Sequence, residues 1–580
     1  MHRYSLHSLL KRRINALSER KPFANARVFA SKPIGLPELL YGGVIVGLPF
    51  LVAIINPIWL SNGLLFWDVW FYYGYFTHLY QFISHPIWPA SAYIGTRIPY
   101  ILPGFIFHRI FGDELARYIF NLFVVSGTIL FSCLYVLRNF MPLSVAATTT
   151  AILALDLFFL RSMGWDYVDK GIIAYECLTL VMLTLAVTRR RAEVYLVGAG
   201  FMATSMIFIH LGSIVLFPIF LFYSAFVMNR VESASQFWQH FTHVVFFGVI
   251  GAILCQIIYG SLTVSLHGGD FFFLWRQIRV VKSNLETTQW NVPLPALLDY
   301  GYWITNHLAA FTASVIALLS MWWCRENQPP TRFELFCFWT ASVGYGMLFI
   351  GEATHRLFFF SAIGLYASMF IPITFFCFGN LIFRNAVPSR AMFIFVIVVG
   401  IGSLMVRFDI GNGLGLYSMF SIPMVVLGLT GGCLLAATYL IRSRSAFIAG
   451  IVGLAVLNCF VPWPYFSSDI TIRDAHAFIA RTIDNRLPTV LFDKNDPHLS
   501  EIDAVIGSFT ERAVFASRNT YPEAKAAFKS GDAAVILTSK ETSADRVRAA
   551  LLRSVQEVSL IGLNHIGGLW IYIFNVTSSS

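Results

Sequence analysis

The stretch LLYGGVIVGLPFLVAIINPIWL, residues 39–60, decides the fold class because it contains no charged side chain. A helix needs about 20 mainly apolar residues to cross the hydrocarbon core of a bilayer. Comparable stretches follow one another as far as Pro462, and we predict about thirteen spans. They cover residues 39–60, 115–137, 145–160, 171–187, 193–209, 211–228, 241–264, 303–324, 333–351, 358–380, 391–406, 417–441 and 446–462. The chain is therefore predicted to be a mainly α, polytopic membrane protein.

The composition agrees with this class and excludes an ordinary soluble protein. Hydrophobic residues make up 57% of the 580 residues, charged residues only 12%, and the mean hydropathy is +0.67. Soluble domains carry about 25% charged residues. The eight cysteines lie in or beside predicted spans without a CxxC pair, so the sequence predicts neither a disulfide framework nor a cysteine metal site.

Basic residues predict the orientation of the chain. Lysine and arginine gather in cytoplasmic loops of membrane proteins. Here they gather in the N-terminal tail and in alternate loops: Arg138, Arg189, Arg190, Arg191, Arg230, Arg325, Arg332, Arg384, Arg390, Arg442 and Arg444. We expect that side to be cytoplasmic. The net charge of +10 is then mostly a topology signal, and no nucleic-acid partner is expected.

The predicted domains follow from this topology. Residues 1–38 form a basic cytoplasmic tail, and residues 39–463 form a transmembrane domain with long outward loops at 61–113 and 265–302. An odd number of spans places residues 464–580 outside the cytoplasm, as a small α/β domain. Its predicted strands are 489–493, 513–517, 533–538, 557–563 and 568–576, and its predicted helices are 471–484, 500–508, 522–529 and 543–556.

Asp68 is the first candidate catalytic residue. It lies shortly after the first span, between Trp67 and Trp70, in a stretch (67–82) that suits a helix lying on the membrane surface. A carboxylate among aromatic rings tends to have its pKa raised by desolvation, which suits a general base. The alternative is an aspartate that only caps a helix or lies at the interface.

Asp166 and Asp169 are the next candidates, on the outward loop RSMGWDYVDK (161–170) with Lys170 beside them. They would orient an acceptor hydroxyl or support the base, or else belong to a solvated loop that caps the next helix. The sequence offers no third ligand of matching hardness for a divalent cation. We therefore predict no cofactor and favour a metal-independent site, with a divalent cation left as an alternative.

Several cations on outward loops predict a binding site for phosphate. They are Arg97, Lys170, Arg276, Arg279, Lys282, His355 and Arg356. The spacing of Arg276, Arg279 and Lys282 places them on one helical face, and guanidinium groups are natural phosphate ligands. Each alone could anchor a lipid headgroup, but together they favour a shared anionic ligand. His210, in the turn FIHLG, is interpreted as a packing residue, with a role in the site as the alternative.

The chain resembles a known family in several segments. Asp68 follows the first span, and TRIPYILPGFIFHRIFGDELARY (96–118) leads into the second. RRRAEVYLVGAGFMATSMIFIHLGSIVLFPIFLF (189–222) opens a close helix pair, and THRLFFF (354–360) opens a later span. With the span count and the terminal α/β domain, these segments resemble the GT-C class of integral-membrane glycosyltransferases. That class includes protein O-mannosyltransferases and the aminoarabinose transferase acting on lipid A.

The resemblance implies an activity and roles for residues. It implies a lipid-linked sugar donor, usually on a polyprenyl phosphate, and transfer with inversion to a lipid, glycan or protein acceptor outside the cytoplasm. Asp68 would be the first-loop acid that deprotonates the acceptor, and Arg356 the arginine before a late span. Asp166 or Asp169 would be the second-loop acid. The bacterial inner membrane is the expected location.

The sequence departs from the family at two positions. Asp68 is followed by Val69, whereas many relatives carry paired acids there, and His210 stands where relatives often carry lysine. The single acid favours the metal-independent branch of the class. Both departures leave the sugar and the acceptor undetermined.

Two other classes of function compete with a transferase. A secondary transporter or lipid flippase would carry ionisable groups near the bilayer midplane, and the sequence offers only Asp156 and Glu176 for such a role. A non-catalytic scaffold whose outward domain binds a partner is the third interpretation. The concentration of cations in outward loops argues against both.

Overall fold

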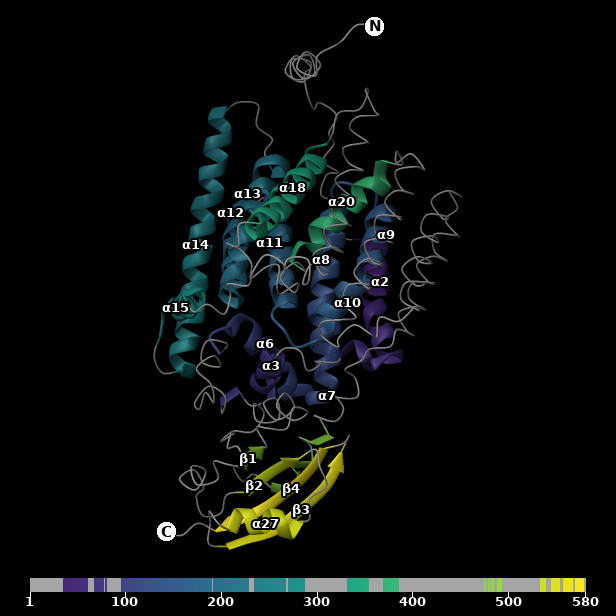
Figure 1. Ribbon diagram of the computed structural model, residues 1–580. Coiled ribbons are helices and arrows are strands. Elements are labelled where there is room, and N and C mark those ends of the chain that lie inside the picture. The colour runs from purple at the N-terminus through teal and green to yellow at the C-terminus, as the bar shows by residue number, and fades with distance from the viewer. Residues whose placement is uncertain are drawn as a thin grey trace.

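The computed structural model describes residues 35–60, 67–77, 79–80, 95–189, 191–228, 234–267, 270–286, 331–353 and 369–384, together with parts of the chain between 474 and 577. The helices form an elongated bundle, and a four-stranded sheet lies at one end of it, called here the sheet end (Figure 1). The longer helices of the bundle are α2 (Leu36–Ile55), α8 (Ser126–Arg138), α9 (Leu143–Ala154), α11 (Asp169–Thr188), α12 (Ala192–Ile209), α14 (Ala234–His267), α18 (Arg332–Ala353) and α20 (Ile371–Arg384).

Shorter elements complete the bundle and form a layer between it and the sheet. Helices α3 (Trp67–Thr77), α6 (Ile98–Phe111) and α7 (Asp113–Ala116) lie in this layer (Figure 1). The remaining short elements are η1 (Pro57–Leu60), η2 (Arg117–Val125), α10 (Leu157–Gly164), η3 (Leu211–Leu216), α13 (Phe217–Phe222), η4 (Tyr223–Met228) and α15 (Leu274–Glu286).

Five helical segments of the described chain are long and apolar enough to cross a membrane. They are Leu36–Ile55, Asp113–Arg138, Asp169–Val187, Ala192–Ile209 and Phe237–Leu266. These segments match the predicted spans that begin at residues 39, 115, 171, 193 and 241, so the mainly helical membrane architecture is confirmed. The predicted spans 303–324, 391–406, 417–441 and 446–462 lie outside the described residues.

The predicted span 145–160 is wrong as a single helix. Helix α9 ends at Ala154, and α10 begins at Leu157. Between them, the carboxylate of Asp156 accepts a hydrogen bond of 2.9 Å from the backbone N–H of Phe159. Aspartate is among the preferred residues at the N-cap, the position that directly precedes a helix. Asp156 therefore starts α10, which gives it a local structural role.

The first span, α2, has one face buried in the bundle and one face exposed. The buried residues of α2 include Val46 and Val52, whereas Leu40, Val44 and Leu51 are each more than half exposed. A row of large exposed aliphatic side chains on one face is what lipid would cover.

The start of α2 is fixed by a carboxylate. Glu38 accepts a 3.0 Å hydrogen bond from the backbone of Gly35 and pairs at 3.0 Å with Arg138, at the end of α8. The start of α2 and the end of α8 therefore lie at the same end of the bundle.

The C-terminal strands form a sheet in the order β1-β2-β4-β3. Strands β1 (Pro488–Phe492) and β2 (Ala533–Thr538) are parallel, while β4 (Leu569–Thr577) is antiparallel to both β2 and β3 (Glu557–Ile566). The predicted strands at 489–493, 533–538, 557–563 and 568–576 are confirmed, and α27 (Ala544–Leu552) lies within the predicted helix 543–556. The predicted strand 513–517 and the predicted helices 500–508 and 522–529 lie outside the described residues.

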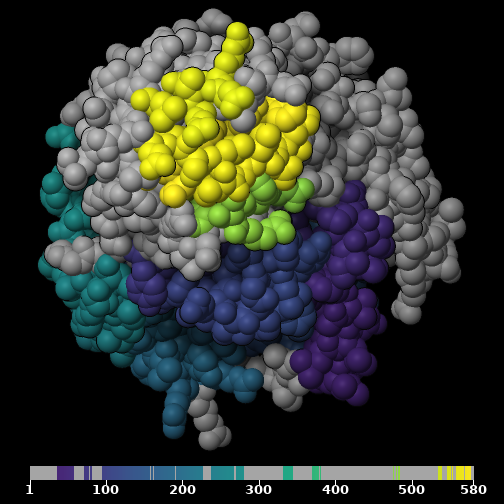
Figure 2. Space-filling model, turned by 90° about the horizontal axis from the view of Figure 1, so that it is seen from below, coloured from purple at the N-terminus to yellow at the C-terminus, as the bar shows by residue number. Residues whose placement is uncertain are grey.

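Both faces of this sheet are covered by apolar side chains. One face packs against Ala475, Ile479 and Ile483, spaced by four as on one side of a helix, and the other packs against Val547 of α27. Seen from the sheet end, the strands lie over part of the bundle, and helices from the first third of the chain are visible beside them (Figure 2).

Helices α12 and α14 approach each other closely at glycine residues on both helices. A Cβ atom at Gly251 would collide with the carbonyl oxygen of Val197, and one at Gly200 with the carbonyl oxygen of Gly248. Small residues at helix interfaces let the two backbones approach closely. In membranes this close packing matters because burying apolar surface between helices contributes little to their association. This contact holds the long α14 against the rest of the bundle.

We predict that Gly251→Ala destabilises the protein by about 1–3 kcal/mol, because the added methyl group overpacks a backbone contact. Thermal unfolding in detergent should then begin at a lower temperature than in the wild type. Gly248→Ala is the matched control three residues away, since its Cβ would meet nothing within 4 Å. Equal melting temperatures for the two variants would contradict the close contact.

Candidate functional site

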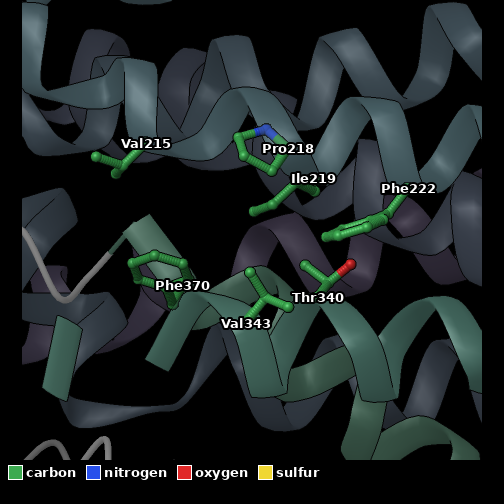
Figure 3. A pocket seen from close by; sticks show the side chains of 7 residues that line it. All are labelled: Val215, Pro218, Ile219, Phe222, Thr340, Val343 and Phe370. Atoms are coloured by element: carbon green, nitrogen blue, oxygen red, sulfur yellow. The ribbon is translucent and has the colours of Figure 1, made fainter. Parts of the chain in front are cut away.

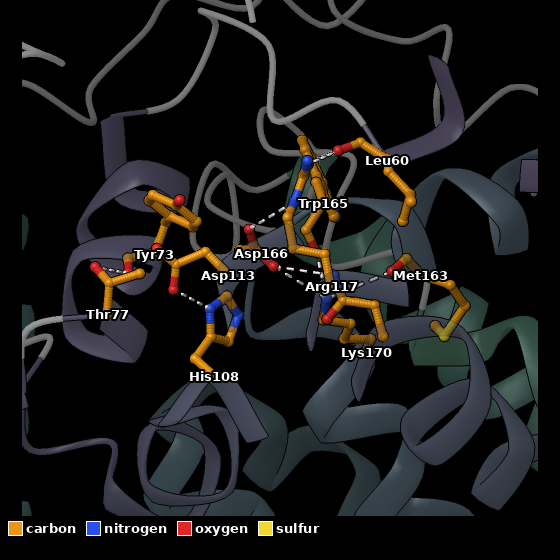
Figure 4. A network of polar contacts seen from close by, with 11 residues as sticks. Leu60, Tyr73, Thr77, His108, Asp113, Arg117, Met163, Trp165, Asp166 and Lys170 are labelled. Carbon is orange, nitrogen blue, oxygen red and sulfur yellow. Dashed lines mark hydrogen bonds and ion pairs between the residues drawn. The ribbon is translucent and has the colours of Figure 1, made fainter. Parts of the chain in front are cut away.

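A cluster of buried charged residues lies where η2, α10 and α11 meet at the sheet end (Figure 4). The carboxylate of Asp166 lies 4.0 Å from Nε of Arg117 and 3.8 Å from Nζ of Lys170. Asn121 donates a hydrogen bond of 2.9 Å to the same carboxylate. None of these side chains is more than 6% exposed. We call these four residues the Asp166 network.

Backbone carbonyl groups orient the two cations of the network. Arg117 donates to the carbonyl oxygen of Leu60, at the end of η1, and Lys170 donates to that of Trp165 at 2.6 Å. The indole N–H of Trp165 in turn lies 3.2 and 3.3 Å from the two carboxylate oxygens of Asp169. These contacts therefore join the end of η1, the residue that follows α10, the start of α11 and the start of the second span.

The placement of Arg117 and Asn121 follows from the geometry of η2. This segment is a π-helical stretch inside an otherwise continuous helix from Asp113 to Arg138. Such stretches are rare and are frequent at functional sites. Arg117 and Asn121, both on η2, contact Asp166, which lies on a different part of the chain.

The charges around Asp166 keep it ionised. Burial would raise the pKa of this carboxyl group, but Lys170 and Arg117 outweigh burial, and with Asn121 they lower the pKa from 3.8 to about 2. An aspartate with so low a pKa is a poor proton acceptor near neutral pH. Asp166 therefore serves as a fixed negative charge that balances Lys170 and Arg117.

A second polar cluster surrounds Arg97, which directly precedes α6 and is 1% exposed. Its guanidinium donates a hydrogen bond to the hydroxyl of Tyr72 on α3 and lies 5.6 Å from the centre of that ring. The Tyr72 ring makes edge-on contacts with Tyr100 at 5.5 Å and with Tyr167 at 5.9 Å. Because Tyr167 directly follows Asp166 in the sequence, the two clusters are neighbours.

Two further polar residues gather near Arg97. His210 accepts a 3.1 Å hydrogen bond through Nδ1 from the backbone of Gly212. Burial, and then the charge of Arg97, hold the pKa of His210 well below its ordinary value, so the ring is neutral. Gln277 of α15 donates to the hydroxyl of Thr96 at 3.2 Å and to the carbonyl oxygen of Phe208 at 2.9 Å. These bonds bring α15 next to the residue that precedes Arg97.

The structure places the other predicted site residues as follows. Asp68 is the second residue of α3, but its side chain is outside the described part, as are His355 and Arg356. The predicted cationic helix is α15, on which Arg279 and Lys282 are exposed. Arg276 of the same helix is 2.5 Å from Asp270. Asp166, Asp169 and Lys170 meet, whereas no ion pair among the described residues joins Arg276 or Arg279 to that group.

Sequence reasoning did not select Arg117, Asn121, Tyr72 or Gln277. Arg117 and Asn121 could have been found from the sequence, because both are polar residues inside a predicted apolar span. Such residues are costly in a membrane unless they are paired, so they indicate a buried polar contact. Tyr72 and Gln277 gave no signal, since their roles depend on contacts with distant segments.

Two other features bear on the kind of site. Within the described ranges, no three His, Cys, Asp or Glu side chains are grouped to hold a metal ion. A small cavity between α13 and α18 is lined by apolar groups and one threonine, and carries no ionisable side chain (Figure 3). Its lining residues are Val215, Pro218, Ile219, Phe222, Thr340, Val343 and Phe370. The polar clusters, and not this cavity, are therefore the candidate for chemistry.

The arrangement of an apolar helical bundle with a small sheet at one end has counterparts among solved structures. The resemblance to glycosyltransferases of the GT-C class is thereby confirmed at the level of the fold. The chain is similar to ArnT from Cupriavidus metallidurans bound to undecaprenyl phosphate, with a TM-score of 0.55 and 11% identity over 92% of this chain and 97% of that one. The apo state of the same aminoarabinose transferase gives a TM-score of 0.54 with the same identity and coverage.

A third solved structure aligns less well. The apo oligosaccharyltransferase of Archaeoglobus fulgidus gives a TM-score of 0.43 at 11% identity over 89% of this chain and 71% of that one. This similarity is too low to support any further conclusion. No protein-family model matches the chain, and no curated protein matches its sequence.

We predict that Asp166→Asn destabilises the protein by about 3 kcal/mol, because it leaves Lys170 and Arg117 buried without this counter-charge. Thermal unfolding at pH 7 should then occur at a lower temperature. Asp113→Asn is the control, since the Asp113 side chain is 48% exposed and lies 3.3 Å from His108; exposed pairs contribute little. Melting curves at pH 7 that coincide for wild type and Asp166→Asn would contradict the assignment.

The same pair of proteins has a predicted pH dependence. Because the pKa of Asp166 falls from 3.8 to about 2 on folding, its contribution is complete above about pH 4 and is lost as the pH falls toward 2. The difference in melting temperature between wild type and Asp166→Asn should therefore stay constant from pH 8 to pH 5 and shrink below pH 4. A difference that shrinks between pH 8 and pH 6 would point to another titrating group.

Proposed function

We propose that the protein is an inverting glycosyltransferase that moves a sugar from a polyprenyl-phosphate donor to an acceptor on the outer side of the membrane. The observation that carries the proposal is the ArnT fold over 92% of the chain together with buried arginine and aspartate clusters at the sheet end. The ArnT structure with undecaprenyl phosphate supports a lipid phosphate as the common part of donor and product.

Arg97 is the described residue best suited to bind the donor phosphate. Its guanidinium is buried, donates a hydrogen bond to the hydroxyl of Tyr72, and lies near enough to His210 to lower the pKa of that ring. An arginine in such surroundings binds phosphate more strongly than one in water. In the proposal, Arg276 and Arg279 of the adjacent α15 extend this cationic region, and His355 and Arg356 complete it.

Lys170 has a different part in the proposal. Its ammonium group is 0% exposed and contacts Asp166 and the carbonyl oxygen of Trp165. We assign Lys170 the role of holding the carboxylates of Asp166 and Asp169 in place. Its effect on the donor phosphate is then indirect, through the positions of these two side chains. The two aspartates then support the base and fix the start of α11.

Asp68 is the proposed general base. The acceptor hydroxyl oxygen forms a bond to the anomeric carbon from the face opposite the polyprenyl phosphate, and the bond from that carbon to the phosphate oxygen breaks. The hydroxyl proton goes to Asp68, and the bond electrons stay on the phosphate, whose charge the cations stabilise. No divalent cation takes part in this proposal.

The test is a transfer assay with the purified full-length chain in lipid nanodiscs. Radiolabelled undecaprenyl-phosphate sugars, with aminoarabinose and mannose as the first two, are offered with lipid, glycan and peptide acceptors. Transfer that continues in EDTA supports the metal-independent proposal. Absence of transfer with every pair, combined with no binding of undecaprenyl phosphate, would refute the proposed function.

Asp68→Asn should lower kcat by at least about 100-fold, the usual contribution of a general base, and leave the affinity for undecaprenyl phosphate unchanged. The substitution keeps the size of the side chain and removes its capacity to accept the proton. Single-turnover transfer and lipid binding measured on the same preparations distinguish the two effects. Wild-type turnover in this variant would remove Asp68 from the mechanism.

Arg97→Gln should weaken binding of undecaprenyl phosphate by at least about tenfold, because hydrogen bonds to a charged group are worth about 1.5–3 kcal/mol. Arg109→Gln is the matched control, an exposed arginine on α6. Tryptophan fluorescence during titration with the lipid measures both affinities. Equal affinities for the two variants would exclude Arg97 from the phosphate site.

One observation favours the alternative of a transporter or lipid flippase. Glu176 lies within α11, is 0% exposed, and neither carboxyl oxygen has a hydrogen-bond partner among the described residues. Buried acids in spans often mark ion pathways. Proteoliposomes discriminate the two functions: a wild type that translocates lipid without transferring sugar, and a Glu176→Gln variant that loses this translocation, would support the flippase.

A further inference from the structure

Tyr73 of α3 lies in the apolar core of the C-terminal domain. Its side chain is 6% exposed and clusters with Ile479 and Ile483 and with Ile571 and Ile573 of β4. Every other described member of this cluster comes from residues 474–577. A residue of the membrane part thus completes one face of the C-terminal sheet.

The same tyrosine also contacts the layer that carries the polar clusters. Its ring lies edge-on to His108 of α6, with 5.9 Å between ring centres. Nδ1 of His108 lies 3.3 Å from a carboxylate oxygen of Asp113, the first residue of α7 (Figure 4). Tyr73 therefore lies between the sheet on one side and α6 and α7 on the other.

The residue before Tyr73 contacts the candidate site. Successive residues of a helix are about 100° apart around its axis, so Tyr72 and Tyr73 project from α3 in different directions. Tyr72 accepts the hydrogen bond from Arg97, while Tyr73 enters the core of the C-terminal domain. The two tyrosines are adjacent on one helix, so a displacement of α3 at Tyr73 would displace Tyr72 as well.

We propose that Tyr73 is a positioning residue through which the C-terminal domain holds α3, and with it the contact between Tyr72 and Arg97. The domain thereby sets the affinity of Arg97 for the donor phosphate. The effect on phosphate affinity rests on the proposed function, whereas the mechanical coupling between the domain and α3 does not.

The coupling is tested by hydrogen–deuterium exchange on the full-length protein in detergent. In Tyr73→Ala the loss of the ring should raise exchange in α3 and at residues 98–111 by roughly tenfold, because local opening of both segments becomes easier. Tyr73→Phe keeps the ring and should exchange close to the wild type. Tyr80→Ala is the control for losing a ring contact with α6 alone, since Tyr80 is 64% exposed and contacts Phe105 of α6 but is not part of the sheet cluster; its exchange should rise less than that of Tyr73→Ala.

A second variant reaches the same contact from the other side. Ile571→Ala, on β4, leaves α3 intact and should also raise exchange at residues 98–111. It keeps the proposal testable should Tyr73→Ala fail to fold. Unchanged exchange at residues 98–111 in Ile571→Ala and in folded Tyr73→Ala would overturn the proposal.

The effect on the site is measured with undecaprenyl phosphate and with a transferable donor. Tyr73→Ala should weaken binding of undecaprenyl phosphate about tenfold and raise the donor KM by the same factor, while kcat at saturating donor is retained. A purely structural role would lower kcat by reducing the active fraction, and that result would also overturn positioning.

The outcomes separate the two proposals. Faster exchange in the variants, with a wild type that neither binds undecaprenyl phosphate nor transfers sugar, would refute the proposed function and leave the coupling standing. Wild-type transfer with unchanged exchange in the variants would refute the coupling alone.

Discussion

The pairing of buried charges around Asp166 constrains the rest of the structure. Asp166, Lys170 and Arg117 are all removed from water, and a buried charge is tolerated only when it is paired and hydrogen-bonded. The partners come from different elements, so satisfying them fixes η2 against α10 and α11. The carbonyl oxygens of Leu60 and Trp165 extend this constraint to the end of the first span.

Much of the fold could be predicted from apolar length alone, because a bilayer sets the length of a crossing helix. The segments beginning at residues 39 and 171 are examples, confirmed as α2 and α11. The sequence did not reveal that the helix breaks at Asp156. A single aspartate in an apolar stretch can be a polar residue within one span or the cap of a new helix, and hydropathy does not distinguish the two. The π-helical stretch of η2 leaves no trace in hydropathy, since it changes the rotation of the helix and not its composition.

The candidate site was predicted only where its residues are close together in the sequence. Asp166, Asp169 and Lys170 were selected from one loop and do meet. Asn121 bonds to Asp166 across 45 residues, and Gln277 bonds to the end of α12 across 69, so no local pattern could reveal either contact. The roles of Asp68 and Arg356 stay predictions, because their side chains lie outside the described residues.

The length of α14 has a consequence for the lipids around the protein. Its apolar part, Phe237–Leu266, is 30 residues or about 45 Å long, while α12, packed on it through glycine, is 18 residues or about 27 Å. The hydrocarbon core is about 30 Å thick, and only 11% of the most apolar window of α14 is buried. This hydrophobic mismatch makes the surrounding lipid layer thicker, or α14 more tilted, on the flank that α14 forms, and neighbouring acyl chains there must adapt to a longer apolar surface than the one that α12 presents.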